Sequence, residues 1–181
     1  MDSEMMAELL REAGHVSVED PKRADLIIVN TCAFIRPARE ESYGVLSELA
    51  AQKRPGQLLV AAGCLPQRYG DAIRRRVPGV DSIIGAQSWP KIVTFVEGLE
   101  RLGPRDAASG LVEQGGNLVA SVGRRATMGA TAYLKIADGC DAACAFCAIP
   151  LIKGPQRSKP VGDVLREARE LAEQGVREIV L

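Results

Sequence analysis

The sequence has little of what marks membrane proteins, secreted proteins or polyanion-binding proteins. Its 181 residues contain no apolar run near the roughly 20 residues that a bilayer requires. The acidic start MDSEMMAELL is unlike a secretory signal, which begins with positive charge. The 23 basic and 23 acidic side chains cancel, so no overall field attracts the chain to nucleic acid or to an anionic membrane. We therefore expect a globular, cytoplasmic protein without a membrane partner.

Histidine and aromatic residues are also scarce, whereas cysteine is not. The one histidine, His15, lies far from the cysteine-rich segment, and aromatic residues make up only 4% of the chain. Few aromatic rings leave few platforms on which nucleobases could stack. In a reducing compartment, five cysteines are more often metal ligands or reactive groups than disulfide partners, and their odd number points the same way.

The first hundred residues alternate between apolar runs and helical patterns. Continuous apolar runs of the kind buried on both faces of a parallel sheet predict strands at 24–30, 57–63 and 80–84. Apolar stripes with helical spacing predict helices at 3–13, 38–53, 66–77 and 89–102. This order predicts an α/β fold, with right-handed βαβ crossovers and a parallel sheet that has helices on both faces.

The composition changes after residue 102. Residues 103–131 contain six glycines and no sustained period, which is typical of a linker, although 118–122 could form a short strand. A strand at 133–137, a helix at 161–174 and a strand that begins at 177 follow. We expect one domain at 1–102 and the start of another at 132–181. Strand, helix and strand cannot close a core alone, so we expect the second domain to be cut off early.

Three cysteines with the spacing C-x3-C-x2-C form the most specific motif. Cys140, Cys144 and Cys147 lie within eight residues, directly after a predicted strand and the strand-breaking Gly139. Three thiolates on one tight loop can hold three corners of an iron–sulfur cube, and the fourth iron then has no protein ligand. An iron without a protein ligand is a site for reaction.

Three other interpretations of this motif fit less well. A zinc knuckle needs four ligands, and no nearby histidine or cysteine supplies the fourth. A redox CxxC pair at a helix start leaves Cys140 without a role. An apolar helical stripe disagrees with Gly139, Asp141 and Pro150, which favour a loop. The iron–sulfur interpretation is therefore preferred.

Two further cysteines each follow a predicted strand. Cys32 and Cys64 lie just beyond the carboxyl ends of the first two predicted parallel strands, where open α/β sheets place their ligand sites. Two such loops can converge on one ligand. From position alone, buried cysteines that pack as small hydrophobic residues explain the pattern equally well.

Longer stretches around these cysteines carry a family resemblance. The C-x3-C-x2-C motif with Phe146 before its last cysteine resembles the signature of radical S-adenosylmethionine (SAM) enzymes. The strings NTCAFIRPAREES, AAGCLPQRY, VDSIIGAQSW and YLKIADGCDAACAFCAIP are similar to the methylthiotransferases, above all to the branch that modifies an aspartate of a ribosomal protein. The resemblance covers almost the whole chain apart from the linker. It implies a parallel-sheet methylthiotransferase domain followed by the start of a radical SAM (β/α) barrel.

The resemblance implies SAM and two 4Fe-4S clusters as cofactors. Cys140, Cys144 and Cys147 would hold the SAM-binding cluster, while Cys32 and Cys64 would be two of three ligands of an auxiliary cluster. The family's third ligand belongs to a GC-x-KN-x-VDSE motif. The sequence opens at the tail of that motif, DSE, so we expect the third ligand upstream of Met1. The codon of Met1 would then be an internal valine codon taken as a start.

Residues beside the cysteine loop could contact the cofactor. Phe146 within the motif and Lys159 in the following basic stretch are candidates for contact with SAM. Lys159 stands where the family usually has arginine, so the charge is kept but the bidentate fork is lost. Lys153, Arg157 and Lys159 could face SAM or an acidic substrate, and a solvated loop is an equally good explanation.

The implied reaction adds a methylthio group to the β-carbon of an aspartate in the small-subunit ribosomal protein numbered twelve. A flavodoxin-type or ferredoxin-type electron donor and a monomeric enzyme are expected, and no turnover by this chain alone. The tRNA adenosine methylthiotransferases (MiaB type) would share all five cysteines, although FIRPAREES after Cys32 favours the ribosomal-protein branch. A non-catalytic iron–sulfur electron-transfer module is the alternative from another class, and it would neither bind nor cleave SAM.

Overall fold

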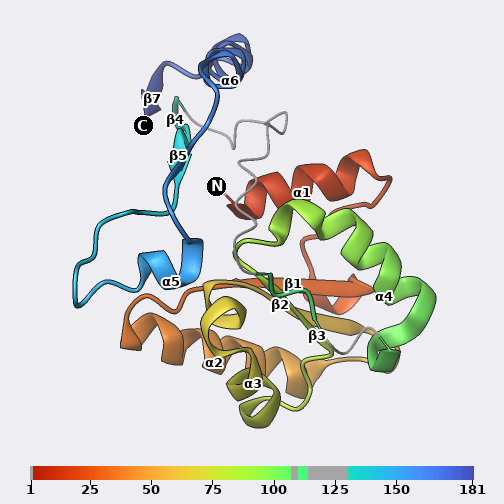
Figure 1. Ribbon diagram of the computed structural model, residues 1–181. Helices are drawn as coiled ribbons and strands as arrows, with labels where there is room; N and C mark the ends of the chain where they lie inside the picture. The colour runs from red at the N-terminus through yellow and green to blue at the C-terminus, as the bar shows by residue number, and fades with distance from the viewer. Residues whose placement is uncertain (1, 107–109, 114–129) are drawn as a thin grey trace.

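A computed structural model describes residues 2–106, 110–113 and 130–181 (Figure 1). Its first unit is a three-stranded parallel sheet in the order β1-β2-β3. The strands are β1 (Leu26–Thr31), β2 (Leu58–Gly63) and β3 (Ser82–Gly85). The helices are α1 (Asp2–Glu12), α2 (Arg36–Gln52), α3 (Cys64–Arg76) and α4 (Ile92–Asp106), with short 3-10 turns η1 (Pro21–Arg23) and η2 (Trp89–Lys91). The predicted α/β class with a parallel sheet is confirmed.

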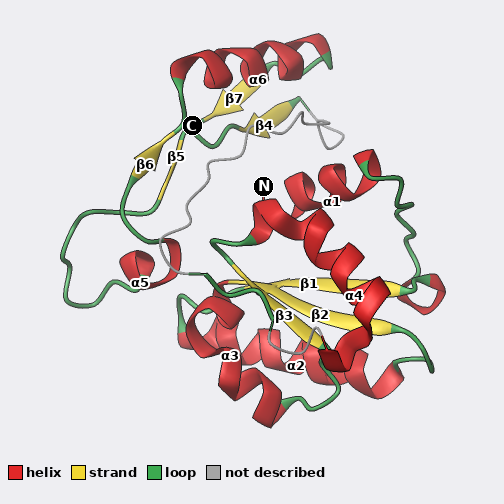
Figure 2. Cartoon of the chain, turned by 45° about the vertical axis from the view of Figure 1, so that its right-hand side comes forward, coloured by secondary structure: helices red, strands yellow, loops and turns green. Residues whose placement is uncertain are grey.

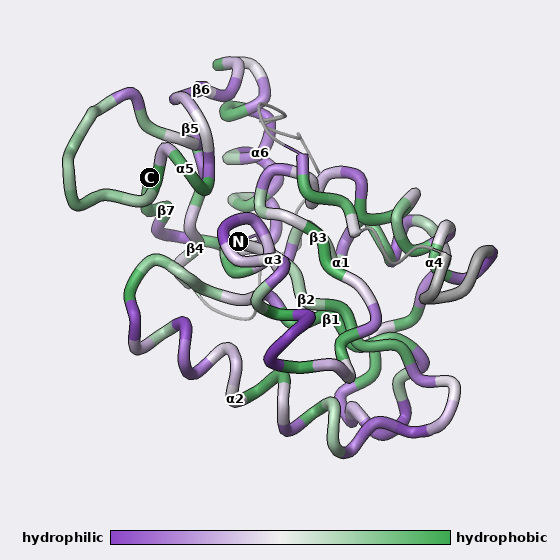
Figure 3. The backbone as a smooth tube through the Cα atoms, turned by 60° about the horizontal axis from the view of Figure 1, so that its bottom comes forward, coloured by the Kyte–Doolittle hydropathy of each residue, from purple (hydrophilic) through white to green (hydrophobic). Residues whose placement is uncertain are grey.

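Helices cover both faces of this sheet because its central strand is apolar on both sides. Figure 1 shows α1 and α4 over one face and α2 and α3 over the other. In β2, Val60 and Ala62 pack into the cluster shared with α1 and α4, while Leu59 and Ala61 pack into the cluster shared with α2 and α3. All four side chains are fully buried. The hydropathy colouring of Figure 3 shows the same concentration of hydrophobic residues in the strands.

The second unit is smaller and lies beyond the carboxyl end of the sheet (Figure 2). Strand β4 (Thr131–Tyr133) pairs in parallel with β7 (Glu178–Val180), and α6 (Val161–Glu173) lies between them in sequence. Strand β5 (Ala137–Asp138) pairs antiparallel with β6 (Arg157–Ser158), and α5 (Ile149–Lys153) precedes β6. Leu171 of α6 is fully buried against Ala132 and Val176. This parallel strand–helix–strand arrangement is what the first strands of a (β/α) barrel require.

The structure differs from the sequence-based expectation in the second unit. The strand expected at 133–137 is split, because the chain changes partners along it. The Leu134 amide donates to the Val180 carbonyl, whereas the Ile136 carbonyl accepts from the Lys159 amide. Helix α5 is absent from the sequence-based prediction, since five residues are too few to show a helical period. The possible strand at 118–122 lies outside the described residues.

Candidate functional site

Cys32 and Cys64 lie side by side at the carboxyl edge of the sheet. Thr31 is paired in register with Gly63, so each cysteine is the next residue on neighbouring parallel strands, which lie about 4.8 Å apart. Cys32 is exposed and Cys64 is half-buried. The structure therefore brings together the two thiols that the sequence placed after separate strands.

Polar contacts fix the loop that carries Cys32. The Cys32 amide donates to Ser42 Oγ at 3.1 Å, and the Ser42 hydroxyl lies 2.8 Å from the Ala38 carbonyl oxygen in α2. Thr31 Oγ1 donates to the Ala62 carbonyl at 2.6 Å and so ties the ends of β1 and β2 together. These contacts hold the exposed Cys32 beside Cys64 even though its own side chain packs against little.

The third ligand expected for the Cys32–Cys64 pair is not tested by the structure. The resemblance places that ligand upstream of Met1, and Met1 itself lies outside the described residues, which begin at Asp2. Asp2 and Ser3, which match the end of the family motif, form the first turn of α1. A third ligand upstream of Met1 therefore stays a prediction.

Several charges act on Cys64. Burial is the largest influence and raises the pKa of the thiol above its ordinary value. The ammonium of Lys153 opposes this rise in pKa, whereas the negative charges of Cys32, Asp2 and Asp138 add to it. A free thiol at this position therefore stays protonated, and a bound cation would be needed to favour the thiolate.

The loop with Cys140, Cys144 and Cys147 extends away from β5 and returns to α5 (Figure 1). The Cys140 amide donates to the Gly154 carbonyl at 3.1 Å, and the Cys147 amide donates to the Cys144 carbonyl at 3.1 Å. Two sulfurs accept backbone hydrogen bonds of 3.5 Å, Cys140 Sγ from Ala142 and Cys147 Sγ from Ile149. These hydrogen bonds hold the sulfurs of Cys140 and Cys147 against the backbone of the loop.

The three loop thiols share a loop but do not converge. Among the described residues, no three cysteine, histidine, aspartate or glutamate side chains are placed to hold one metal ion. The donor set nevertheless fits an iron–sulfur group in its chemistry, since soft thiolate sulfur is the ligand that such clusters take. Phe146, between Cys144 and Cys147, is 91% exposed.

The carboxyl-terminal end of the cysteine loop packs against the sheet edge that carries Cys64. Ala148 and Ile152 are buried with Ala86 in a small cluster, and Cys64 packs against it. Because Ala148 directly follows Cys147, the loop is anchored one residue beyond its last thiol. The segment that directly follows Cys147 thus lies at the same edge of the sheet as Cys64.

A set of charged residues beside Cys64 has no signal in the sequence. Lys153 Nζ lies 2.8 Å from Asp2 Oδ2, and Lys135 Nζ lies 3.1 Å from Asp2 Oδ1 and 2.6 Å from Asp138 Oδ2. The sequence alone suggests only that Lys153 could face SAM or a substrate. No local pattern signals a contact between residues 133 and 151 positions apart.

Lys159 is inside the second unit. It is 5% exposed, and its ammonium forms a buried ion pair with Glu167 of α6. Lys153 is also largely buried, whereas Arg157 is exposed. A fully solvated loop therefore does not describe this stretch. Contact of Lys159 or Phe146 with SAM stays a prediction.

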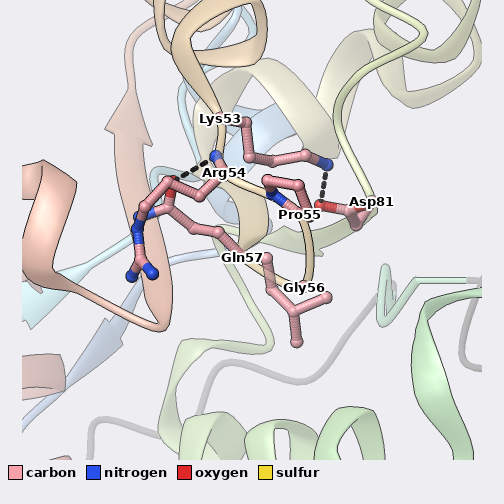
Figure 4. A pocket seen from close by; sticks show the side chains of 7 residues that line it. Lys53, Arg54, Pro55, Gly56, Gln57 and Asp81 are labelled. Carbon is pink, nitrogen blue, oxygen red and sulfur yellow. Dashed lines mark hydrogen bonds and ion pairs between the residues drawn. The ribbon is translucent and has the colours of Figure 1, made fainter.

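A surface hollow lies at the opposite end of the sheet from the cysteines. It has a volume of about 430 Å³ and is lined by residues 53–58 and Asp81 (Figure 4). The charged groups on its wall already have partners: Lys53 Nζ lies 2.6 Å from Asp81 Oδ2, and Arg54 Nη2 donates to the Ala24 carbonyl. The hollow is thus a surface feature of the α2–β2 turn and not part of the thiol site.

The first 85 residues match a known domain family. Residues 1–85 fit the profile described as "Uncharacterized protein family UPF0004". This range contains β1, β2 and β3 and both sheet-edge cysteines.

Relatives that align with the whole chain are methylthiotransferases by name. The chain is 43% identical to the "Ribosomal protein uS12 methylthiotransferase RimO" of Herpetosiphon aurantiacus, with 100% of this chain and 44% of that protein aligned. Proteins of the same name from Chloroflexus aurantiacus and Roseiflexus sp. (strain RS-1) are 47% and 44% identical, each with 100% of this chain and 42% of the relative aligned. The chain is thus homologous to these enzymes along its whole length, and the resemblance to the ribosomal-protein branch of the methylthiotransferases is confirmed.

The matches cover only part of each relative. The chain spans about two fifths of the length of these curated relatives, 44% of the first and 42% of the second. In the part that the structure describes, no helix is long and apolar enough to cross a membrane. The names of the relatives give a ribosomal protein, and not tRNA, as their substrate.

Proposed function

We propose that this chain carries the cysteine ligands of a radical SAM methylthiotransferase whose substrate is an aspartate of ribosomal protein uS12. The homology along the whole chain and the cysteine spacing support this proposal. A cytoplasmic location, a monomeric enzyme and a flavodoxin-type or ferredoxin-type electron donor belong to the same proposal. So do the domain limits at 1–102 and 132–181, with the linker at 103–131.

Each cysteine group has its own role in this proposal. Cys140, Cys144 and Cys147 would hold the SAM-binding 4Fe-4S cluster, and Cys32 and Cys64 would supply two ligands of an auxiliary 4Fe-4S cluster. When bound, the SAM-binding cluster supplies the one-electron chemistry that removes a hydrogen from an unactivated carbon, which no side-chain base can do at neutral pH. Phe146 and Lys159 remain candidates for contact with SAM.

The chain's own residues hold the cysteine loop in place. Backbone amides of Ala142 and Ile149 donate to the sulfurs of Cys140 and Cys147 and help to fix their orientation. The buried contacts of Ala148 and Ile152 keep the loop against the sheet edge.

The positions of Cys32 and Cys64 give the proposal its main structural support. Cys32 and Cys64 follow paired positions on neighbouring strands, and the end of the second cysteine loop packs against Cys64. Buried structural cysteines would explain Cys64 but not the exposed Cys32, which follows the same edge of the sheet. A shared two-cluster site explains both.

Anaerobic reconstitution of the chain with iron and sulfide tests the ligand assignment. We expect bound iron and sulfide, and an electron paramagnetic resonance signal of the reduced protein that changes when SAM is added. Cys144→Ala should abolish the SAM-dependent change, whereas Cys32→Ala should retain it. Zinc bound in preference to iron, or a SAM effect that survives Cys144→Ala, would contradict the proposal.

A deletion strain tests the substrate. Mass spectrometry should show uS12 without its methylthio group and tRNA unchanged, and the reverse result would assign the tRNA reaction instead. A cluster that binds no SAM and leaves both substrates unchanged would identify an electron-transfer module. We expect no methylthiolation of uS12 by the 181-residue chain alone, and a mass increase of uS12 incubated with it would contradict that expectation.

A further inference from the structure

A balanced charge network joins the two units beside the cysteines. Asp2 in the first turn of α1 lies between two lysines of the second unit, with its two carboxylate oxygens 2.8 Å from Lys153 Nζ and 3.1 Å from Lys135 Nζ. Asp138 completes the set, 2.6 Å from Lys135 and 3.6 Å from Lys153. The four side chains are between 11% and 22% exposed. Two cations and two anions thus neutralise each other away from solvent.

The same end of α5 is also held by amide groups of the first unit. Gln87 Nε2 donates to the Ile152 carbonyl at 3.0 Å, and the Gln87 amide donates to Gln67 Oε1 of α3. Ile152 is fully buried in the cluster that touches Cys64. Two successive residues, Ile152 and Lys153, are therefore fixed by three separate elements of the first unit.

These contacts are specific to one docked arrangement. An apolar contact tolerates sliding, whereas a carboxylate shared by two ammonium groups and a directed amide bond do not. Both contacts lie within six residues of Cys147, since α5 starts two residues after that thiol. The network can therefore set where the loop thiols stand relative to Cys32 and Cys64.

We propose that Asp2 is a positioning residue that docks the cysteine loop on the Cys32–Cys64 edge through its ion pair with Lys153. The docking is a property of the metal-free chain, and its meaning for catalysis rests on the proposed function. The ion pair would fix the separation of the two metal-binding groups, which the transfer of a group from one to the other requires.

Hydrogen exchange of the metal-free 181-residue chain tests the docking. The amides of Ile152 and Gly154 donate to carbonyls within the α5 turn and report its order. In Asp2→Asn and in Lys153→Met, we expect these amides to exchange about tenfold faster or more, while the amides of β2 stay protected. Lys153→Arg should keep the slow exchange of the wild type because it keeps the positive charge. If Lys153 acted only by packing, the charge would make no difference between the Met and Arg variants.

A matched control separates docking from a general loss of an ion pair. Lys53 and Asp81 lie 2.6 Å apart with 19% and 18% exposure, close to the values for Lys153 and Asp2, but they lie within the first unit. Lys53→Met should leave exchange in α5 unchanged. Unchanged exchange in both Asp2→Asn and Lys153→Met, or equal acceleration in Lys53→Met, would overturn the proposal.

Iron reconstitution distinguishes a failure of docking from a failure of the proposed function. Asp2→Asn keeps all five cysteines, so its iron content should equal that of the wild type. A wild-type chain that binds no iron but shows the expected exchange pattern would support the docking and refute the function. A wild-type chain that binds iron, with variants that exchange like the wild type, would refute the docking and leave the proposed function supported.

Discussion

Two glycines shape the backbone directly before a candidate ligand. Gly63 precedes Cys64 with φ of +95°, and Gly139 precedes Cys140 with φ of +78°. A Cβ atom at Gly63 would lie 2.9 Å from the Thr31 carbonyl oxygen, and one at Gly139 would lie 2.6 Å from the Gly154 carbonyl oxygen. Both positions therefore need glycine for its conformation and for space.

Gly139→Ala should disrupt the cysteine loop without unfolding the sheet. The left-handed backbone conformation costs a residue with a side chain about 1–2 kcal/mol, and the added methyl group would also displace the backbone at Pro155. We expect a loss of iron retained after reconstitution, with little change in thermal unfolding measured by circular dichroism. Gly162→Ala in α6 meets no atom within 4 Å and should behave like the wild type. Full iron retention by Gly139→Ala would show that the turn tolerates a side chain.

Residues differ in how far the sequence could predict them. The cysteines and Gly139 are predictable because spacing and backbone-breaking residues act locally. The partners of Asp2 are not, since its contacts with Lys135 and Lys153 span 133 and 151 positions and exist only in the folded chain. The sequence places Lys159 in a basic stretch, but its burial depends on Glu167, which lies eight residues further on in α6.

Helix α6 packs against the rest of the second unit through a buried apolar side chain and a buried ion pair. Leu171 is fully buried, and Glu167, one helical turn earlier, is paired with Lys159 with both side chains 1–2% exposed. An ion pair buried this deeply gains little over an apolar pair, but removal of one member leaves an uncompensated charge.

Lys159→Met should therefore destabilise the second unit, by about 3–5 kcal/mol. Lys159→Met combined with Glu167→Leu should recover most of that loss, because neither charge then remains buried. Hydrogen exchange of α6 amides measures both, with β2 amides as the internal reference. A double variant as unstable as the single one would mean that the lysine contributes mainly by packing.

Helices and strands are predicted well where the segment with a regular apolar pattern is long. The three strands and four helices of the first unit agree with the expected ranges to within about two to four residues, because apolar alternation and stripes are strong there. In the second unit, β5, β6 and α5 contain 2, 2 and 5 residues. Their formation depends on partners, as when the Lys159 amide donates to the Ile136 carbonyl.

The contact between the two units should depend on pH through Asp2. Burial is the largest single influence on this carboxyl and by itself raises the pKa, but the nearby ammonium groups of Lys153 and Lys135 outweigh it and hold the pKa below its ordinary value. Asp138 and Cys64 are the other titratable groups that face this network. A lowered pKa means that the docked form binds protons less readily than the undocked form. The ionised Asp2 therefore contributes its full stabilisation to docking above the ordinary pKa of about 4. This contribution is lost as pH falls through the lowered pKa of Asp2 in the docked form.

Small-angle X-ray scattering between pH 6 and pH 3, a range chosen to bracket an ordinary aspartate pKa of about 4, measures this directly. We expect the radius of gyration to rise at the acidic end while far-UV circular dichroism still reports the helices. Asp2→Asn should show the larger radius already at neutral pH. A wild-type radius that stays constant until the helices unfold would indicate that the units do not separate before the chain denatures.

The small apolar cluster between the units has a thermodynamic consequence. Within the described residues it consists of Ala86, Ala148 and Ile152 with Cys64 against them, and the other contacts that dock α5 are made by charged or amide groups. The heat capacity change of any opening depends on the apolar area that becomes wet, and here that area is small. Separation of the units therefore leaves little trace in a calorimeter, and its free energy varies almost linearly with temperature. We therefore expect salt and acid, rather than heating or cooling, to separate the two units.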